Sequence, residues 1–197
     1  DAQIAIRESL IDVPTMKEVF FAQDNFTTTG DAEFIGAWHL FDGGHELTGS
    51  FTSEHWTFQG FDFPMLGGDL VWTRDLFEIT RATSGFYGGG LEFTYAMKPL
   101  GSDEQSIATF APRVSGAELL PLFDAIGISG IRPLGTVGGE VLLEWPTNNF
   151  DDRRGHASLN FVPANEVPLQ SRAVRPVGRR IGWSYAERSF APDGEPW

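Results

Sequence analysis

A short segment that begins with glycines and ends in tryptophan occurs twice in this chain, and it limits what the chain can fold into. Residues 66–72 read Leu-Gly-Gly-Asp-Leu-Val-Trp, and residues 137–145 read Val-Gly-Gly-Glu-Val-Leu-Leu-Glu-Trp. A polar bend that carries Phe77 or Phe150 follows each copy. Repeated amphipathic strands align their apolar faces into one surface. The pattern favours a domain built from degenerate β repeats, and a binding or structural role over chemistry at one point.

The spacing of apolar residues extends this prediction along the chain. Residues 91–97 alternate Leu, Phe, Tyr and Met with Glu, Thr and Ala, which is typical of a strand with one buried and one solvated face. The same period of two begins at Phe34, and Asp42-Gly43-Gly44 predicts a hairpin turn. We expect further strands at residues 47–51, 56–63 (closed by Pro64), 69–73, 77–82, 107–114, 139–145 and 157–162.

These strands define a β-repeat domain over residues 34–162. Within it, Ser115 to Glu118 read as a capping box followed by apolar residues at helical spacing, which predicts one short helix near 115–126. Pro121 favours a helix that starts near Leu120. Residues 1–33 form an N-terminal flank, in which 16–21 fit a short helix or a strand. Residues 163–197 form an irregular tail that contains Pro and Arg.

The fold class that follows is all-β, with an antiparallel sheet and one short helix. Seventeen Phe, six Trp and 23 Gly are typical of turn-rich antiparallel structure. The aromatic stripe on alternating positions can line an open, curved sheet or fill a closed, sandwich-like one. The residues leave both alternatives open.

Composition argues against several classes of function. The net charge of -13 argues against nucleic-acid binding and against general adhesion to anionic lipid headgroups, which both need clustered Lys and Arg. The absence of Cys rules out a disulfide framework and a thiolate metal site. No apolar run approaches the roughly 20 residues of a membrane-spanning helix. The first ten residues lack a signal-peptide pattern, so we expect a mature product or an excised fragment.

The side chains that could carry catalysis or bind a metal are scattered. His39, His45 and His55 lie in one hairpin region, but their spacing matches no zinc motif and favours surface histidines. No G-x-S-x-G nucleophile elbow occurs. Residues 88–90 are three glycines that precede a strand rather than a helix, so they fit a bulge and not a phosphate loop. We expect a protein that is not an enzyme and has no cofactor and no metal.

Two groups of residues remain as candidate binding sites. The aromatic stripe is the first, and its candidate ligand-binding residues are Trp38, Leu40, Phe51, Trp72, Phe93, Tyr95 and Trp145. The second is a set of arginines in the tail, namely Arg172, Arg175, Arg179 and Arg180. Arginines in an otherwise acidic chain favour docking onto an acidic partner or a lipid phosphate. Ordinary pairing with the surplus carboxylates of the chain is the alternative.

Several segments resemble the AsmA/TamB-like family of bacterial envelope proteins. The resemblance covers about residues 34–162, and the motifs that carry it are Glu46 to Phe51, Phe61 to Trp72, Phe77 to Thr80, Ser84 to Gly90 and Phe93 to Tyr95. It implies a β-taco, which is a long curved sheet with an apolar trough that passes phospholipid between membranes. Family members are anchored in the inner membrane by an N-terminal helix. This chain departs from the family by lacking that helix and by being too short to cross the periplasm alone.

The resemblance implies a non-catalytic periplasmic domain that binds or conducts lipid along an apolar face. An acyl chain gains about 0.8 kcal/mol for each methylene removed from water, so such a face must be apolar along its length. The expected partners are phospholipid or another lipid, and further repeats of a longer protein or envelope membrane proteins. The alternative is a structural or assembly subunit of an envelope membrane-protein complex, a closed β-sandwich docked through its Pro/Arg tail.

Overall fold

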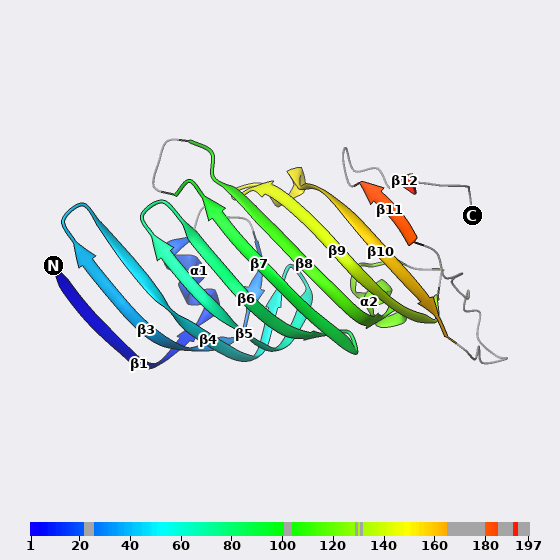
Figure 1. Cartoon of the computed structure of the whole chain (residues 1–197), viewed down its shortest axis with the longest axis horizontal. Helices are drawn as coiled ribbons and strands as arrows, with labels where there is room; N and C mark the ends of the chain where they lie inside the picture. Colours follow the sequence, from blue (N-terminus) through cyan, green and yellow to red (C-terminus); the bar gives the residue numbers. More distant parts are fainter. Residues whose placement is uncertain are drawn as a thin grey trace.

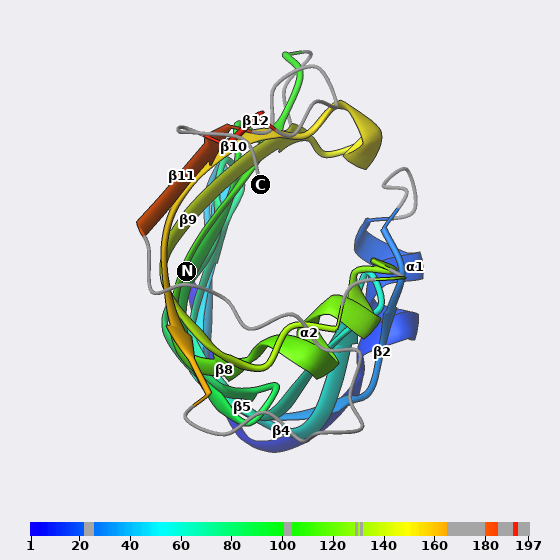
Figure 2. The same cartoon turned by 90° about the vertical axis from the view of Figure 1, so that its right-hand side faces the viewer.

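One antiparallel sheet, bent into a trough, accounts for most of the chain (Figures 1 and 2). The structure is a computed structural model, and it describes residues 1–21, 26–100, 104–128, 130, 132–164, 180–184 and 191–192. This architecture confirms the prediction of an all-β, curved antiparallel sheet. The described strands form one open sheet and not two packed ones, so the sandwich-like alternative for the fold is wrong.

The strands follow one another both along the chain and across the sheet. They are β1 (Ala2–Asp12), β2 (Thr28–Thr29), β3 (Asp31–Phe41), β4 (Gly44–Phe58), β5 (Phe61–Thr73), β6 (Phe77–Phe86), β7 (Gly89–Lys98), β8 (Ile107–Glu118), β9 (Gly135–Pro146), β10 (Arg154–Pro163), β11 (Arg180–Ser184) and β12 (Ala191–Pro192). The sheet order is β1-β3-β4 and then sequential to β12, while β2 pairs with β4. Each strand therefore lies beside its neighbour in sequence over most of the sheet.

Two α-helices accompany the sheet where one was predicted. Figure 2 looks along the trough and shows α1 (Val13–Phe20) at the open side of the curved sheet and α2 (Leu119–Ala125) inside the curve. At the start of α1, the Asp12 carboxylate accepts a hydrogen bond from the Thr15 backbone N–H at 2.8 Å. Asp12 is thus a helix N-cap, a strong start signal. Residues 16–21, for which helix and strand were both open, are mainly helical.

The helix α2 is shorter than the predicted segment 115–126. Residues 115–118 continue β8, because Gly116 takes a positive φ of 67° and lets Ala117 and Glu118 pair with Val137 and Thr136 of β9. Glu118 is the N-cap residue, without a side-chain capping bond. The predicted capping box is therefore not formed.

The predicted strand 56–63 is divided between two strands. Gln59 and Gly60 have φ values of 52° and 82°, and they form the tight turn between β4 and β5. Strand β5 then continues through Pro64, which pairs with His55. Two successive residues with positive φ match the twist of a hairpin. A proline removes only its own N–H from the ladder, so it is tolerated where that donor is not needed.

Both ends of the chain add strands to the predicted repeat domain. In the flank 1–33, β1 pairs with β3 from Ala2 opposite Leu40 to Asp12 opposite Asp31. In the tail 163–197, which was expected to be irregular, β11 pairs with β10 and places Trp183 opposite Ala157. The sheet therefore extends beyond residues 34–162 on both sides.

The core lies on the concave face of the sheet. In β7, Leu91 and Met97 are buried while Glu92 and Thr94 are exposed, which confirms the predicted alternation of this strand. The buried cluster includes Leu119 of α2, which lies inside the curve (Figure 2). The apolar face is thus the inner one.

Candidate functional site

A row of apolar side chains crosses the floor of the trough from β1 to β9. Strand register makes its members successive neighbours, in the order Ile4, Trp38, Leu47, Trp72, Phe77, Met97, Ala108 and Trp145. We call these eight residues the tryptophan row. The tryptophans of both sequence repeats belong to it. The repeated motif therefore places both of its tryptophans in the same row across the sheet.

A second row runs beside the first, and we call it the tyrosine row. Its members are Ile6, Gly36, Gly49, Leu70, Ile79, Tyr95, Phe110, Leu143 and Gly155. The ring of Phe34 lies over two of its glycines, because a Cβ atom on Gly36 or Gly49 would come within 2.8 or 2.6 Å of the Phe34 Cζ atom. These glycines make room for an aromatic ring on the concave face.

All seven predicted ligand-binding residues lie on this concave face. Trp38, Trp72 and Trp145 belong to the tryptophan row, and Tyr95 belongs to the tyrosine row. The other three, Leu40, Phe51 and Phe93, each lie two residues from a row member and therefore on the same face of their strand. Their accessibility differs. Trp145 and Phe51 are 3% and 5% exposed, whereas Trp38 at the β1–β3 end is 37% exposed. Trp72, Phe93 and Tyr95 are half-buried.

The predicted arginine site lies almost entirely beyond what the structure describes. Arg172, Arg175 and Arg179 are outside the described residues, and Arg180 is described only as the first residue of β11. Docking through the tail stays a prediction.

Seven aromatic side chains form a closed series of ring contacts inside the trough. The successive ring-centroid distances are 6.5 Å for Phe21–Phe26, 5.3 Å for Phe26–Phe58, 6.4 Å for Phe58–Phe150, 5.1 Å for Phe150–Trp145, 6.1 Å for Trp145–Tyr95, 6.2 Å for Tyr95–Phe77 and 5.4 Å for Phe77–Phe21. All fall in the range of favourable aromatic pairs. We call this closed set the aromatic belt.

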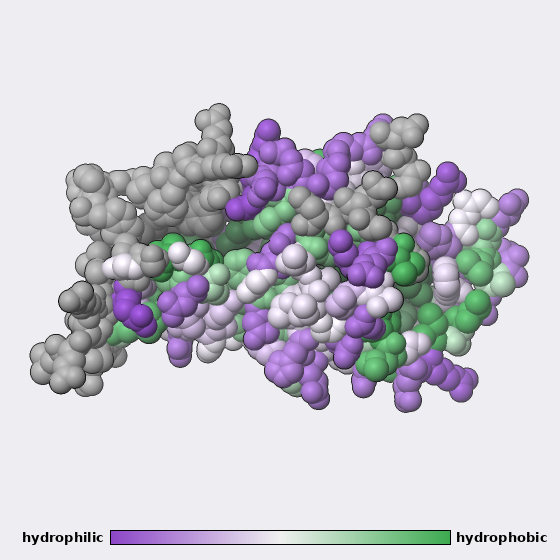
Figure 3. Space-filling model, turned by 180° about the vertical axis from the view of Figure 1, so that it is seen from behind, coloured by the Kyte–Doolittle hydropathy of each residue, from purple (hydrophilic) through white to green (hydrophobic). Residues whose placement is uncertain are grey.

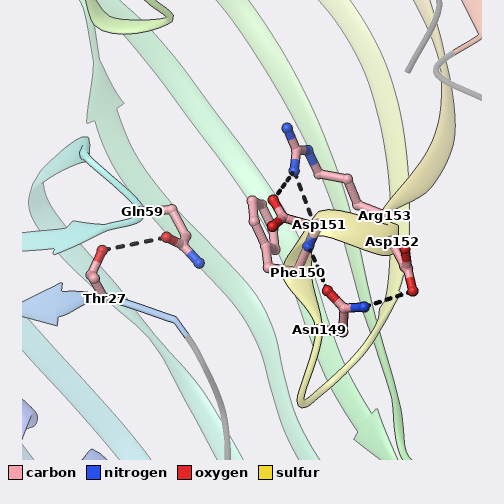
Figure 4. Close-up of polar contacts among 7 residues, drawn as sticks. All are labelled: Thr27, Gln59, Asn149, Phe150, Asp151, Asp152 and Arg153. Atoms are coloured by element: carbon pink, nitrogen blue, oxygen red, sulfur yellow. Dashed lines mark hydrogen bonds and ion pairs between the residues drawn. The ribbon is translucent and has the colours of Figure 1, made fainter. Parts of the chain in front are cut away.

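One contact of the aromatic belt spans the open side of the trough. Phe58 ends β4, whereas Phe150 lies in the 3-10 helix η1 (Phe150–Asp152) between β9 and β10. Three strands, β6 to β8, separate these two hairpins in the sheet. Figure 4 shows them facing each other, with Gln59 on one side and Phe150 on the other. We call Phe58–Phe150 the rim contact.

Short polar contacts fix Phe150 within its own loop (Figure 4). The Arg153 guanidinium lies 4.7 Å from the centre of the Phe150 ring, and its Nη1 donates to the Phe150 carbonyl oxygen at 3.1 Å. The Asn149 amide accepts from the Asp151 N–H at 3.2 Å and donates to the Asp152 carboxylate at 2.6 Å. The loop is therefore a small preformed unit that holds one aromatic ring.

The opposite rim is organised in a similar way. The Thr27 hydroxyl donates to Gln59 Oε1 at 3.3 Å (Figure 4), and the Lys17 ammonium lies 5.6 Å from the centre of the Phe26 ring. Phe26 packs directly on Phe58. Each rim thus carries a cation over an aromatic ring, an arrangement that stabilises both groups.

The open side of the trough shows apolar surface between polar margins. Figure 3 views this side, where green patches lie among purple side chains and gather again toward the end that carries β1 and β3. At that end Ile4 is 48% and Leu40 36% exposed. The concave face is therefore apolar up to the edge of the sheet, and the residues at its margins are polar.

Two titratable side chains, Tyr87 and His45, pack against aromatic rings of the trough. Burial raises the pKa of Tyr87, whose ring packs edge-on against Phe86 at 4.7 Å. The His45 ring lies between Trp38 and Trp72, at 6.2 and 5.6 Å. Within the described ranges no three His, Asp or Glu side chains are grouped so that they could hold a metal ion. Among the same residues, no helix combines the length and apolarity needed to cross a bilayer.

The sequence interpretation missed most of the aromatic belt. One signal was present, because Phe77 and Phe150 each come five residues after the tryptophan of their repeat. Phe58 directly precedes the Gln59-Gly60 turn, and it was hidden inside the predicted strand 56–63. No short-range pattern links Phe58 to Phe150, since only the curvature of the whole sheet brings them together.

Comparison with known proteins adds no relative to this description. No family model matches the chain, and neither the curated proteins nor the solved structures contain a match.

Proposed function

We propose that this chain is a non-catalytic, AsmA/TamB-like β domain of the bacterial periplasm that binds or conducts lipid along its concave face. The observation that carries the proposal is the pair of adjacent apolar rows on that face. Trp72, Phe93 and Tyr95 are half-buried there, so each side chain keeps some solvent-accessible surface.

The dimensions of the rows suit a lipid tail. The tryptophan row passes through eight strands, from β1 to β9. Strands lie about 4.8 Å apart, so the row spans roughly 34 Å. One leaflet contributes half of a hydrocarbon core that is about 30 Å thick. The accessible members of the row are Ile4, Trp38, Leu47 and Trp72, whereas Phe77, Met97, Ala108 and Trp145 are buried. The accessible part spans roughly 14 Å, close to the length that one leaflet contributes.

A photo-crosslinking experiment tests this function. A benzophenone amino acid at Phe93 should capture phospholipid in cells, because this position faces the trough. The same residue at Thr94, which is exposed on the other face of β7, is the matched control and should capture none. Native mass spectrometry of the purified chain should detect co-purified phospholipid. Crosslinks to protein alone at Phe93 and several other inward positions would contradict lipid binding.

The aromatic belt favours a second candidate, a structural or assembly subunit of an envelope membrane-protein complex. The rim contact closes the trough at one level, and the floor residues Phe51 and Trp145 are buried by the protein's own side chains. On this alternative the trough is a filled core, and other surfaces contact the partner. Inward crosslinkers would then react only within the chain, and a crosslinker on the convex face would capture an envelope protein.

A further inference from the structure

Strand β1 forms an open edge of the sheet, at the end that carries Trp38 (Figure 1). On one side β1 pairs with β3, and on its other side no strand of the described part of the chain lies beside it. Every second residue of an edge strand points its backbone N–H and C=O groups away from the sheet, where a further strand can pair with them. Such an edge is a binding surface unless its sequence blocks pairing.

The first half of β1 lacks the features that block pairing. Residues 2–6 read Ala-Gln-Ile-Ala-Ile, without a charge, a proline or a glycine. The side chains of residues 2–5 are exposed. The second half differs, because Glu8 has a φ of 119° within the irregular part of the β1–β3 ladder. Bulges and charges interrupt regular pairing at an edge. A partner strand therefore fits along residues 2–6 only.

The charges that flank this segment are complementary to each other. When two copies of β1 run antiparallel with Ile4 opposite Ile4, Asp1 of each copy lies opposite Arg7 of the other. Both residues share the convex side with Ala5, so the two charges meet on one face. Opposite charges at directly opposed positions stabilise a strand pair. Moving one copy by two residues in either direction separates these charges.

The two charges are also available for such a pairing. Asp1 and Arg7 are exposed, and neither side chain forms an ion pair with any residue that the structure describes. Behind them, Trp38 and Leu40 of β3 are still partly open to solvent, although they lie one strand in from the edge. This end of the sheet thus presents an uncharged strand, exposed apolar side chains and matching charges.

We propose that a second copy of this chain pairs antiparallel with the first through residues 2–6 of β1, about a two-fold axis at Ile4. The interface is isologous, because the same segment serves both copies. A two-fold axis normal to the sheet keeps both concave faces on the same side. The inference goes beyond the proposed lipid-binding function and does not depend on it.

This pairing joins the accessible parts of two tryptophan rows. Each copy contributes Ile4, Trp38, Leu47 and Trp72, and the two Ile4 side chains meet at the axis. The joined row crosses β1, β3, β4 and β5 of both copies. With about 4.8 Å between strands it spans roughly 34 Å, compared with roughly 14 Å in one copy.

Single cysteines test the position of the axis, because the chain contains no Cys of its own. Ile4→Cys sets a thiol opposite the same thiol of the second copy. Strand pairing brings their Cα atoms to about 4.5–5.5 Å, within reach of a disulfide. Ala2→Cys and Ile6→Cys are matched controls on the same face, since each lies about 14 Å from its own copy.

Mild oxidation should link the Ile4→Cys variant into a dimer on a non-reducing gel and should leave the two controls monomeric. Equal linking of all three variants, or linking of none, would overturn the pairing.

Sedimentation velocity over a range of protein concentrations measures the dissociation constant of the dimer. Ile4→Glu opposes two carboxylates at the axis and should weaken the dimer by more than about tenfold. Val162→Glu also converts an exposed apolar residue, in β10, and should change nothing. Circular dichroism checks that both variants are folded. A parent protein that stays monomeric, or a dimer that Ile4→Glu leaves unchanged, contradicts the proposal.

A charge exchange tests the register independently. Arg7→Glu and Asp1→Lys each oppose like charges and should raise the dissociation constant by about twofold to thirtyfold, the factor for two such pairs. The double variant opposes unlike charges again and should recover the parent value. Arg74→Glu, in the turn between β5 and β6, controls for net charge. Further weakening in the double variant would rule out this register. These measurements use no lipid, so their outcome is separate from that of the photo-crosslinking experiment.

Discussion

The two sequence repeats occupy equivalent places in the sheet but end differently. In the first, Trp72 of β5 is half-buried and touches Phe21, His45 and Phe77. In the second, Trp145 of β9 is only 3% exposed. Phe77 opens the next strand, whereas Phe150 leaves the sheet in η1 and reaches the opposite rim. The repeat motif therefore fixes the position of its tryptophan along the strand. The bend that follows decides where the next phenylalanine lies, on the floor for Phe77 and at the rim for Phe150.

The largest expected difference between the copies concerns their tryptophans. Trp145→Ala should destabilise the protein by about 3–5 kcal/mol, because it empties a fully packed site. Trp72→Ala should cost at least about 1 kcal/mol less, since its ring already meets solvent and leaves a smaller cavity. Urea denaturation followed by circular dichroism measures both. A larger loss at Trp72 would contradict the difference in burial between the two tryptophans.

Two glycines of the repeats give the next largest difference, namely the second glycine of the second copy and the first glycine of the first copy. Gly139 has a φ of 145°, and a Cβ atom there would lie 2.1 Å from the Ser158 carbonyl oxygen. Gly139→Ala should therefore cost about 1–3 kcal/mol in backbone strain alone. At Gly67 the nearest atom would be 3.5 Å away, which is ordinary contact. Gly67→Ala is the control and should stay within about 0.5 kcal/mol of the parent protein.

A smaller effect is expected from the cation that accompanies the second copy. Arg153→Ala removes the stacking on Phe150 and should cost about 0.5–1 kcal/mol. It should also weaken the rim contact, which hydrogen exchange in residues 149–153 would detect as faster opening. Arg113→Ala, which breaks an exposed ion pair with Glu140 at 2.6 Å, is a control that should leave this exchange unchanged.

The smallest effect depends on pH. It begins at Asp12 and reaches Trp72 of the first copy through helix α1. Hydrogen bonds from the Thr15 side chain and backbone lower the pKa of Asp12, the N-cap of α1, from its ordinary value of 3.8. The carboxylate thus stabilises the helix above that pH, and the contribution disappears as the pH falls through the lower folded pKa.

Since Phe21, directly after α1, packs on Trp72, loss of the cap should alter Trp72 fluorescence first. Asp12→Asn retains a capping side chain and should remove this pH response without removing the helix. An identical acid transition in the variant would show that another group is responsible.

Local pattern predicted the strands better than it predicted the trough. The alternation of Leu91 to Met97 and the turn at Gly43 depend on neighbouring residues, and both were correctly predicted. The turn at Gln59 was missed because the apolar run on either side of it reads as one strand. The edge strand β1 was missed because its side chains are mostly exposed and its pairing with β3 is a tertiary contact.

The same division holds for the candidate site. The seven predicted aromatic and aliphatic residues share the concave face because a period of two assigns faces without any knowledge of the fold. The aromatic belt could not be predicted that way, because it depends on how strongly the sheet curves. Curvature arises from bulges and positive-φ positions such as Arg81, whose φ is 51° beside a register shift between β6 and β7.

The sequential order of the strands has a consequence for how the chain folds. From β4 to β10 each strand pairs with the one that precedes it, so every new pairing closes only a short loop. Short loops lose little entropy on closure, and topologies dominated by near-neighbour contacts fold fast. The sheet can therefore grow strand by strand while the chain is still being delivered. Contacts across the trough, such as the rim contact and the packing of Phe21 on Phe77, must wait until both of the segments that they join exist.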